Sequence, residues 1–302
     1  KTSNLLRCLH TVFGFTHITK RRYYTFMASS KIPWERLWET LRKAIPSPLT
    51  DGRLLLALDD CINPKVGKKI FACHRFFDHA AKQNQSRYPW AQNIVAVGLL
   101  ATIKGRWACL PLDFRFYHPA KAFKDGEVRL GKKKIDFRTK LDQAAEMLRA
   151  IYEAYKLPLL VVADSWFGND GLWKPLHGML AENVHLLSRL RSNINLFDLP
   201  KAPRQRRRGR PAKYGVHLGN VSSMAAHYRD RARAYDVDLY GRMRQVMAFD
   251  RVVMLKTLKR SVRVVWIFRN TRWIALFTTD LSLSVEQIVE YYGARWKIEA
   301  GF

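Results

Sequence analysis

Acidic residues are scarce in this chain of 302 residues. It holds 25 Asp and Glu against 53 Lys and Arg, which gives a formal net charge of +28 and a pI near 10.3. A surplus this large repels itself in a compact molecule unless a polyanion is bound. The composition therefore favours nucleic acid as a partner, and a solvated basic surface is the alternative.

Cysteine and long apolar runs are also sparse. The four cysteines, Cys8, Cys61, Cys73 and Cys109, are widely spaced and form no C-x-x-C pair. This spacing argues against a disulfide scaffold and a zinc knuckle, and it fits a reducing cytoplasm. No apolar run reaches the roughly 18 to 20 residues of a membrane span, and the N-terminus lacks a signal-peptide core. We therefore expect a cytoplasmic protein with no membrane partner.

Apolar residues are present in the amount that a folded domain needs. Hydrophobic residues make up 48% of the chain and aromatic residues 12%, which offsets the conformational entropy lost on folding. The chain begins at Lys1 without an initiator methionine. We therefore expect it to be a fragment that lacks part of an N-terminal region.

Hydrophobic periodicity predicts an α/β fold with four parts. Residues 1–50 are expected to be helical and basic, and residues 51–190 to form a mixed sheet flanked by helices. Residues 191–279 are expected to be a basic and β-rich insertion, and residues 280–302 a final core helix. Strands are expected at residues 53–59, 68–77, 94–102, 108–117 and 159–164, and helices at 135–155, at 169–183 and from Ser284 onward, where Gln287 completes a capping box.

Carboxylates stand at the ends of two apolar strands. "LLLALDD" ends in Asp59 and Asp60, and "LPLLVVAD" ends in Asp164. Ligand sites of α/β sheets form at the carboxyl ends of strands. An aspartate in that position also commonly begins a turn, so each of these residues alone has a structural explanation.

The last helix offers a third acid in "EYYGARWKIEAGF". Heptad spacing places Val285, Tyr292 and Glu299 on one face, which Trp296 broadens, so Glu299 is expected to continue an apolar stripe. A carboxylate there needs a partner. Arg295, four residues earlier, is one candidate, and a metal ion is the other.

Taken together, the three motifs resemble insertion-sequence DDE transposases of the cut-and-paste type, which have an RNase H-like core. Tyr292, Arg295 and Glu299 fit the Y-x2-R-x3-E signature of that family, "LALDDCINPKVGKK" resembles its first-aspartate segment and "LVVADSWFGN" its second. The resemblance covers roughly residues 18 to 302. It implies an RNase H-like fold with the β-rich insertion placed before the final core helix.

The resemblance also implies a chemistry. Asp59, Asp164 and Glu299 would be the catalytic acids and the ligands of two Mg²⁺ ions, with Mn²⁺ as a substitute and Asp60 as the alternative to Asp59. Tyr292 and Arg295 would contact DNA phosphates. The implied activity is cleavage at the terminal inverted repeats of an element, through a DNA hairpin, and strand transfer to target DNA by a homodimer in a synaptic complex. A family lysine after the glutamate would lie beyond Phe302.

The insertion contains the basic segment "KAPRQRRRGRPAKYG". Its cations Arg207, Arg208, Arg210 and Lys213 are expected to bind DNA, either as an AT-hook in the minor groove or as an exposed phosphate-binding loop. Two other functions remain open at this stage. One is an RNase H-like nuclease without strand transfer, and the other is a non-catalytic basic DNA-binding protein.

Overall fold

The computed structural model describes most of the chain. The described residues are 2–12, 14–27, 29, 36, 39–40, 43, 45, 49–67, 70–79, 81–124, 126–130, 133–200 and 212–299. They divide into two compact units, Lys1–Pro46 and Ser47–Phe302.

The first unit is helical where it is described. It contains α1 (Thr2–Thr11) and α2 (Lys20–Met27). The basic residues Lys20, Arg21 and Arg22 lie exposed on α2. The helix predicted around Leu37 and Leu41 falls outside the described residues. No described helix is long and apolar enough to span a membrane.

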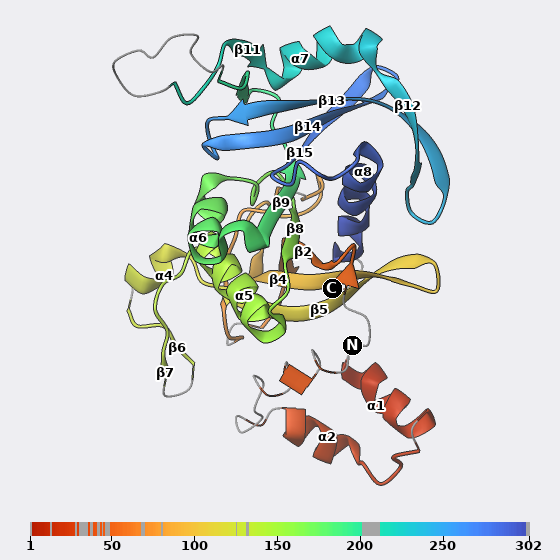
Figure 1. Cartoon of the computed structure of the whole chain (residues 1–302). Coiled ribbons are helices and arrows are strands. Elements are labelled where there is room, and N and C mark those ends of the chain that lie inside the picture. Colours follow the sequence, from red (N-terminus) through yellow and green to blue (C-terminus); the bar gives the residue numbers. More distant parts are fainter. Residues whose placement is uncertain are drawn as a thin grey trace. The chain divides into compact units, whose positions relative to one another are not determined.

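The second unit is built on one large mixed sheet (Figure 1). At its centre β2 pairs antiparallel with β4, which pairs with β5, and on its other edge β2 runs parallel to β8, which runs parallel to β9. The strands are β2 (Arg53–Pro64), β4 (Trp90–Ile103), β5 (Arg106–Tyr117), β8 (Leu159–Ala163) and β9 (Val184–Arg189). An antiparallel meander continued by parallel strands through crossover helices is the RNase H-like arrangement, as the sequence predicted.

Two helices make the crossovers between the parallel strands. Helix α5 (Lys140–Tyr155) joins β5 to β8 and begins with a capping box between Thr139 and Asp142, and α6 (Asp170–Leu180) joins β8 to β9. The remaining short elements are β1 (Leu49–Thr50), β3 (Cys73–Arg75), α4 (Ala120–Lys124), β6 (Arg129–Leu130), β7 (Lys133–Lys134) and the 3₁₀ turns η1 (Ala181–Asn183) and η2 (Arg229–Arg231). The strand predicted over residues 68–77 is thus much shorter, because only β3 pairs with β4.

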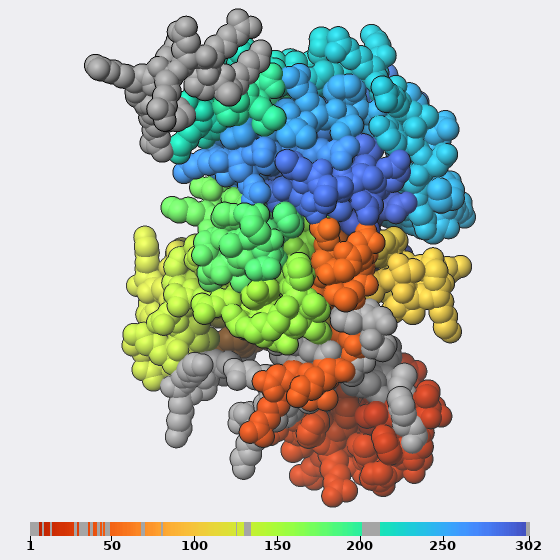
Figure 2. Space-filling view, viewed as in Figure 1, coloured from red at the N-terminus to blue at the C-terminus, as the bar shows by residue number. Residues whose placement is uncertain are grey.

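The insertion extends the core sheet. Strand β15 pairs antiparallel with β9, and β14, β13, β10 and β11 follow outward, with β12 paired to β13. These elements are β10 (Asn195–Phe197), β11 (His217–Asn220), α7 (Val221–Tyr228), β12 (Arg233–Asp238), β13 (Met243–Leu255), β14 (Arg260–Arg269) and β15 (Arg272–Thr278). In Figure 2 the cyan and blue residues of the insertion form a surface continuous with the green residues of the core.

Helix α8 (Val285–Ala294) packs on one face of this sheet, which we call the α8 face. Its buried residues Ile288, Tyr291 and Ala294 share a core cluster with Leu55 and Ala57 of β2. The predicted capping box is confirmed, since the Ser284 side chain accepts from the Gln287 N–H and the Gln287 side chain from the Ser284 N–H. The α8 face therefore belongs to both the core and the insertion.

The predicted length of this helix is wrong. The α-helix ends at Ala294, and Arg295–Lys297 form a 3₁₀ turn, η3. Because a 3₁₀ turn winds more tightly, the heptad face does not continue through it. Trp296, predicted to face the core, is 48% exposed, while the arginine before it is buried.

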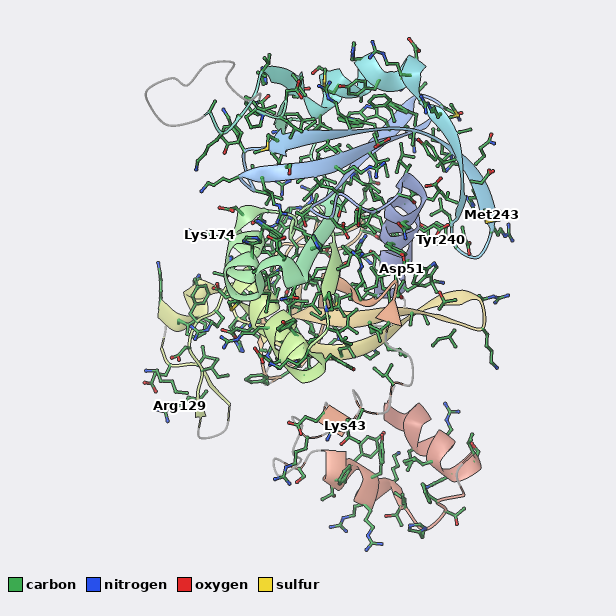
Figure 3. All side chains as sticks on the ribbon, in the orientation of Figure 1. Lys43, Asp51, Arg129, Lys174, Tyr240 and Met243 are labelled. Atoms are coloured by element: carbon green, nitrogen blue, oxygen red, sulfur yellow. The ribbon has the colours of Figure 1, made fainter. Side chains whose placement is uncertain are left out.

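The turn before β2 holds α8 in place. Asp51 (labelled in Figure 3) has φ of 50° and accepts hydrogen bonds from the Gln287 amide at 2.7 Å and from the Tyr291 hydroxyl. Burial and the nearby Asp51 raise the pKa of Tyr291, so the phenol remains a donor. Arg53, at the start of β2, pairs with Asp280, shortly before α8. The central strand and the last helix are thus joined at one end by polar contacts.

Candidate active site

Asp59 and Asp164 lie side by side on the α8 face. Strands β2 and β8 are parallel, with Leu58 paired to Ala163, so the next pair along the register is Asp59 and Asp164. Adjacent strands are about 4.8 Å apart and their paired side chains point to the same face. Alternate residues of a strand point to the same face, so Asp59 faces the same side as Leu55 and Ala57, and Asp164 the same side as Leu160 and Val162. These four apolar residues pack against α8.

Asp60 points to the other face. Its Oδ2 accepts from Lys140 Nζ at 2.8 Å, at the start of α5, and from Asn93 Nδ2 at 3.0 Å. The Lys140 ammonium lies over the rings of Tyr117 and Trp166, 5.3 and 5.4 Å from their centroids. Asp60 therefore has a complete set of partners on the α5 side, away from Asp164.

The backbone of the loop after β8 holds Asp164. Its Oδ1 accepts from the N–H groups of Trp166 at 2.9 Å and Phe167 at 3.1 Å, as expected for an aspartate that begins a turn. Its carbonyl oxygen accepts from Ser188 Oγ at 2.6 Å and from the Gly168 N–H at 3.1 Å. These bonds fix the carboxyl group and leave Oδ2 without a hydrogen bond from the described residues.

Arg295 is the cation of the site. Its side chain is 5% exposed, its Nη1 donates to Asp59 Oδ2, and its Nη2 lies 3.5 Å from Glu299 Oε1. The guanidinium also lies 5.6 Å from the Tyr292 ring centroid and 5.2 Å from that of Trp296. Arg295 is therefore a buried bridge between the first and third predicted acids.

The charge of Asp59 is disfavoured where it lies. Burial raises its pKa to about 6, Arg295 opposes this rise, and the neighbouring Asp164 adds to it. The Asp60 N–H donates to Asp59 Oδ1 at 2.9 Å, which helps the ionised form. Since the rise prevails, one guanidinium does not fully offset burial next to a second carboxylate.

Glu299 and Tyr292 differ in their surroundings. The predicted burial of Glu299 is wrong, because its side chain is 44% exposed and lies beyond η3. Tyr292 is half-buried on α8, and burial raises the pKa of its phenol. Arg295 and Arg189 oppose that rise. The i,i+4 pair of Arg295 with Glu299 is present, as one of the two sequence hypotheses required.

No three His, Cys, Asp or Glu side chains of the described residues are arranged to hold a metal ion. The donor set nevertheless fits a hard divalent cation, since Asp59 and Asp164 share a face and Mg²⁺ prefers carboxylate oxygen. Burial, with a smaller contribution from Asp164, raises the pKa of Asp59, and a bound divalent cation would lower this pKa again. A bound cation would activate water or a hydroxyl nucleophile and stabilise the leaving oxygen.

Exposed arginines continue from this site across the insertion. Arg189 is paired in register with Leu276, Arg269 with Arg272, and Arg233 with Ala248. Leu276 and Ala248 belong to the core cluster that α8 forms with the sheet, so their partners Arg189 and Arg233 point to the α8 face. Arg272 lies four residues before Leu276 on β15, and strand alternation therefore places Arg272 and its partner Arg269 on the same face. We call Arg189, Arg233, Arg269 and Arg272 the arginine face. No described acid forms an ion pair with them.

The sequence analysis missed the arginine face, although the density of arginine in residues 229–272 was a visible signal. The basic loop that it chose instead lies outside the description, since Arg207, Arg208 and Arg210 are not among the described residues. Lys213 is described and is exposed. The hollow beside Arg233 is lined by Arg231, Arg233, Tyr235, Ala248, Phe249 and Asp250.

An RNase H-like core with two carboxylates at the ends of adjacent parallel strands defines a class of nucleic-acid-processing enzymes. Residues 16–246 match the family model of the DDE superfamily endonucleases, and the chain belongs to this family. The match supports an endonuclease-type activity on DNA. It includes Asp59 and Asp164 and ends before Tyr292, Arg295 and Glu299.

No curated protein matches the chain. Among solved structures it is similar to the NurA nuclease from Sulfolobus solfataricus, with 10% identity and a TM-score of 0.31 over 92% of this chain and 86% of that one.

Proposed function

We propose that this chain is the catalytic part of an insertion-sequence transposase that cleaves DNA at the element's ends and joins the freed 3′ hydroxyl to target DNA. The placement of Asp59 and Asp164 on one sheet face, in register on neighbouring parallel strands, carries the proposal. Membership of the DDE superfamily endonucleases supports it.

Each acid has a role in this proposal. Asp59 and Asp164 hold Mg²⁺, for which Mn²⁺ can substitute, and Glu299 completes the site when its pair with Arg295 opens. Tyr292 and Arg295 would contact the phosphate at the scissile bond, and the Arg295 guanidinium could bind two phosphate oxygens at once. The arginine face lies on the same side of the sheet and would bind the DNA backbone leading to these residues. A homodimer would bring two element ends together.

The function is tested on DNA that flanks the coding sequence and carries inverted repeats. With Mg²⁺, a transposase gives both cleaved ends and joined products. Cleavage without joining would replace this proposal with a nuclease, and binding without cleavage would replace it with an architectural DNA-binding protein.

The acids are tested by amide substitution. Asp59→Asn and Asp164→Asn should each lower cleavage at least about 100-fold, because metal-assisted charge stabilisation supplies several kcal/mol. DNA binding measured by gel shift should survive in both variants.

Asp60→Asn is the matched comparison on the same strand. It removes a charge that pairs with Lys140 on the opposite face, so cleavage should stay within about tenfold of wild type despite a stability loss on the order of 1 kcal/mol. Activity that disappears in Asp60→Asn and persists in Asp59→Asn would reverse the assignment of the first ligand.

A further inference from the structure

Arg295 lies among the carboxylates of the candidate active site. Its guanidinium reaches from Asp59 to Glu299, and Asp59 lies beside Asp164 on the same face. The site thus gathers three carboxylates around one buried monovalent cation. A cation in this position lowers the repulsion that the carboxylates would otherwise exert on one another.

One donor of the Arg295 guanidinium group lacks a hydrogen-bond partner among the described residues. That donor, Nε, is buried, and the contact with Glu299 is at the 3.5 Å limit. A buried donor without a partner costs free energy, which a fully built structural ion pair would avoid. The contact with Asp59 is the closer of its two carboxylate contacts, and it involves a carboxylate that the proposed function assigns to metal.

The backbone changes from an α-helix to a 3₁₀ turn at Arg295. Arg295 is the C-cap of α8 and the first residue of η3. Hydrogen bonds of 3₁₀ turns are poorer in geometry than those of an α-helix, and such turns are common at helix ends. Trp296, the next residue, is 48% exposed while Arg295 and Ile298 are buried, so the turn is packed on one side only.

We propose that Arg295 is an internal counter-ion that competes with the divalent metal for Asp59 and must leave this carboxylate before the metal site is complete. The inference rests on the proposed use of a metal by Asp59 and Asp164. A divalent cation bound to Asp59 would lie next to the Arg295 guanidinium, and the repulsion between these two positive charges sets metal binding against the Arg295–Asp59 pair. The displaced guanidinium and Glu299 are then free, the first for a DNA phosphate and the second for the metal.

The test measures Mn²⁺ binding to the full chain without DNA, by the loss of the free Mn²⁺ electron paramagnetic resonance signal. In Arg295→Gln the competitor is gone, and the Kd for Mn²⁺ should fall at least about tenfold. The gain should disappear when Asp164→Asn is added. In metal-free buffer Arg295→Gln should melt below wild type, and Mn²⁺ should raise its melting temperature more than that of wild type.

Lys140→Gln is the matched control. It also removes a cation that pairs with an aspartate of β2, but on the α5 face, so it should leave the Kd for Mn²⁺ within about twofold. If Arg295→Gln does not fold, Arg295→Lys carries the test. It keeps the charge but lacks the fork that reaches two carboxylates, and its Kd should lie below that of wild type.

The outcomes separate this inference from the proposed function. A Kd in Arg295→Gln or Arg295→Lys equal to or above that of wild type, with binding that still depends on Asp164, overturns the competition and leaves the metal site standing. Absence of Asp164-dependent Mn²⁺ binding in both wild type and Arg295→Gln overturns the metal site and the inference together.

Discussion

Asp59 is a carboxylate in a place that resists its charge. Burial raises its pKa to about 6 from an ordinary value of 3.8, although Arg295 pairs with it. A group whose pKa is higher in the folded state stabilises the fold fully below pH 4, and this contribution is lost as the pH rises through about 6. The ionised form of Asp59, which a cation would bind, therefore lowers the free energy of unfolding at neutral pH.

This cost predicts a pH dependence of stability. Asn mimics the neutral carboxyl group, so the free energy of unfolding of wild type minus that of Asp59→Asn should decrease between pH 4.5 and pH 7.5. The decrease should be on the order of 2 kcal/mol. Urea unfolding in EDTA at each pH measures the difference. A difference that stays constant or increases with pH would contradict the raised pKa.

Sequence could place the aspartates at the strand ends but could not choose between neighbours. Asp59 and Asp60 are consecutive residues that point to opposite faces, so the choice depends on which face meets α8. That face is set by packing between residues more than 200 positions apart. The burial of Arg295 and the exposure of Glu299 were also not predicted. The heptad spacing assumed a regular α-helix, but the α-helix ends at Ala294.

At the scale of elements, the loop between β8 and α6, which holds Asp164, has no room for a side chain at position 168. A Cβ on Gly168 would lie 2.2 Å from Ser188 Oγ and 2.7 Å from its Cβ. Ser188 is buried and its hydroxyl holds the Asp164 carbonyl. A side chain at position 168 would therefore push the loop away from β9 and move Asp164.

Two glycines 10 positions apart give a matched test of this loop. Gly168→Ala should destabilise the protein by about 1–3 kcal/mol through overpacking and should also lower cleavage. Gly178→Ala, in α6, meets nothing within 4 Å and should be neutral or stabilise by up to about 1 kcal/mol. Thermal melts and cleavage assays compare the two. Equal effects would show that the close contact with Ser188 does not position Asp164.

Local signals predicted elements well where their causes were local. The capping box at Ser284 and the apolar runs of β2 and β8 needed only neighbouring residues. Residues 191–279 were predicted only as a basic and β-rich insertion, without individual strands, because β10, β11 and β12 are short or half-exposed and depend on pairing with β13 or with one another. Their partners lie too far along the sequence for periodicity to reveal.

At the scale of the whole molecule, the continuous sheet joins the candidate site to the insertion. The β9–β15 pairing makes one surface of two segments that the sequence divided into core and insertion. Figure 3 places Tyr240 and Met243 on the β12–β13 hairpin, which comes back beside α8, where Tyr240 lines a pocket with Trp107, Gly293 and Lys297. Part of the net charge of +28 therefore lies on the same face as the candidate site, because the arginine face is on the side of the sheet that carries Asp59 and Asp164.

This geometry predicts which cations control DNA binding. Replacing Arg233, Arg269 or Arg272 with Ala should weaken binding about equally for all DNA sequences and reduce the slope of log K against log salt by about 1 each, since each would release about one counterion. Lys156→Ala is the control, because this lysine lies at the end of α5 and already pairs with Glu153. Fluorescence anisotropy between about 50 and 200 mM salt supplies the slopes. An unchanged slope in the three arginine variants, or an equal loss in Lys156→Ala, would mean that DNA follows another surface.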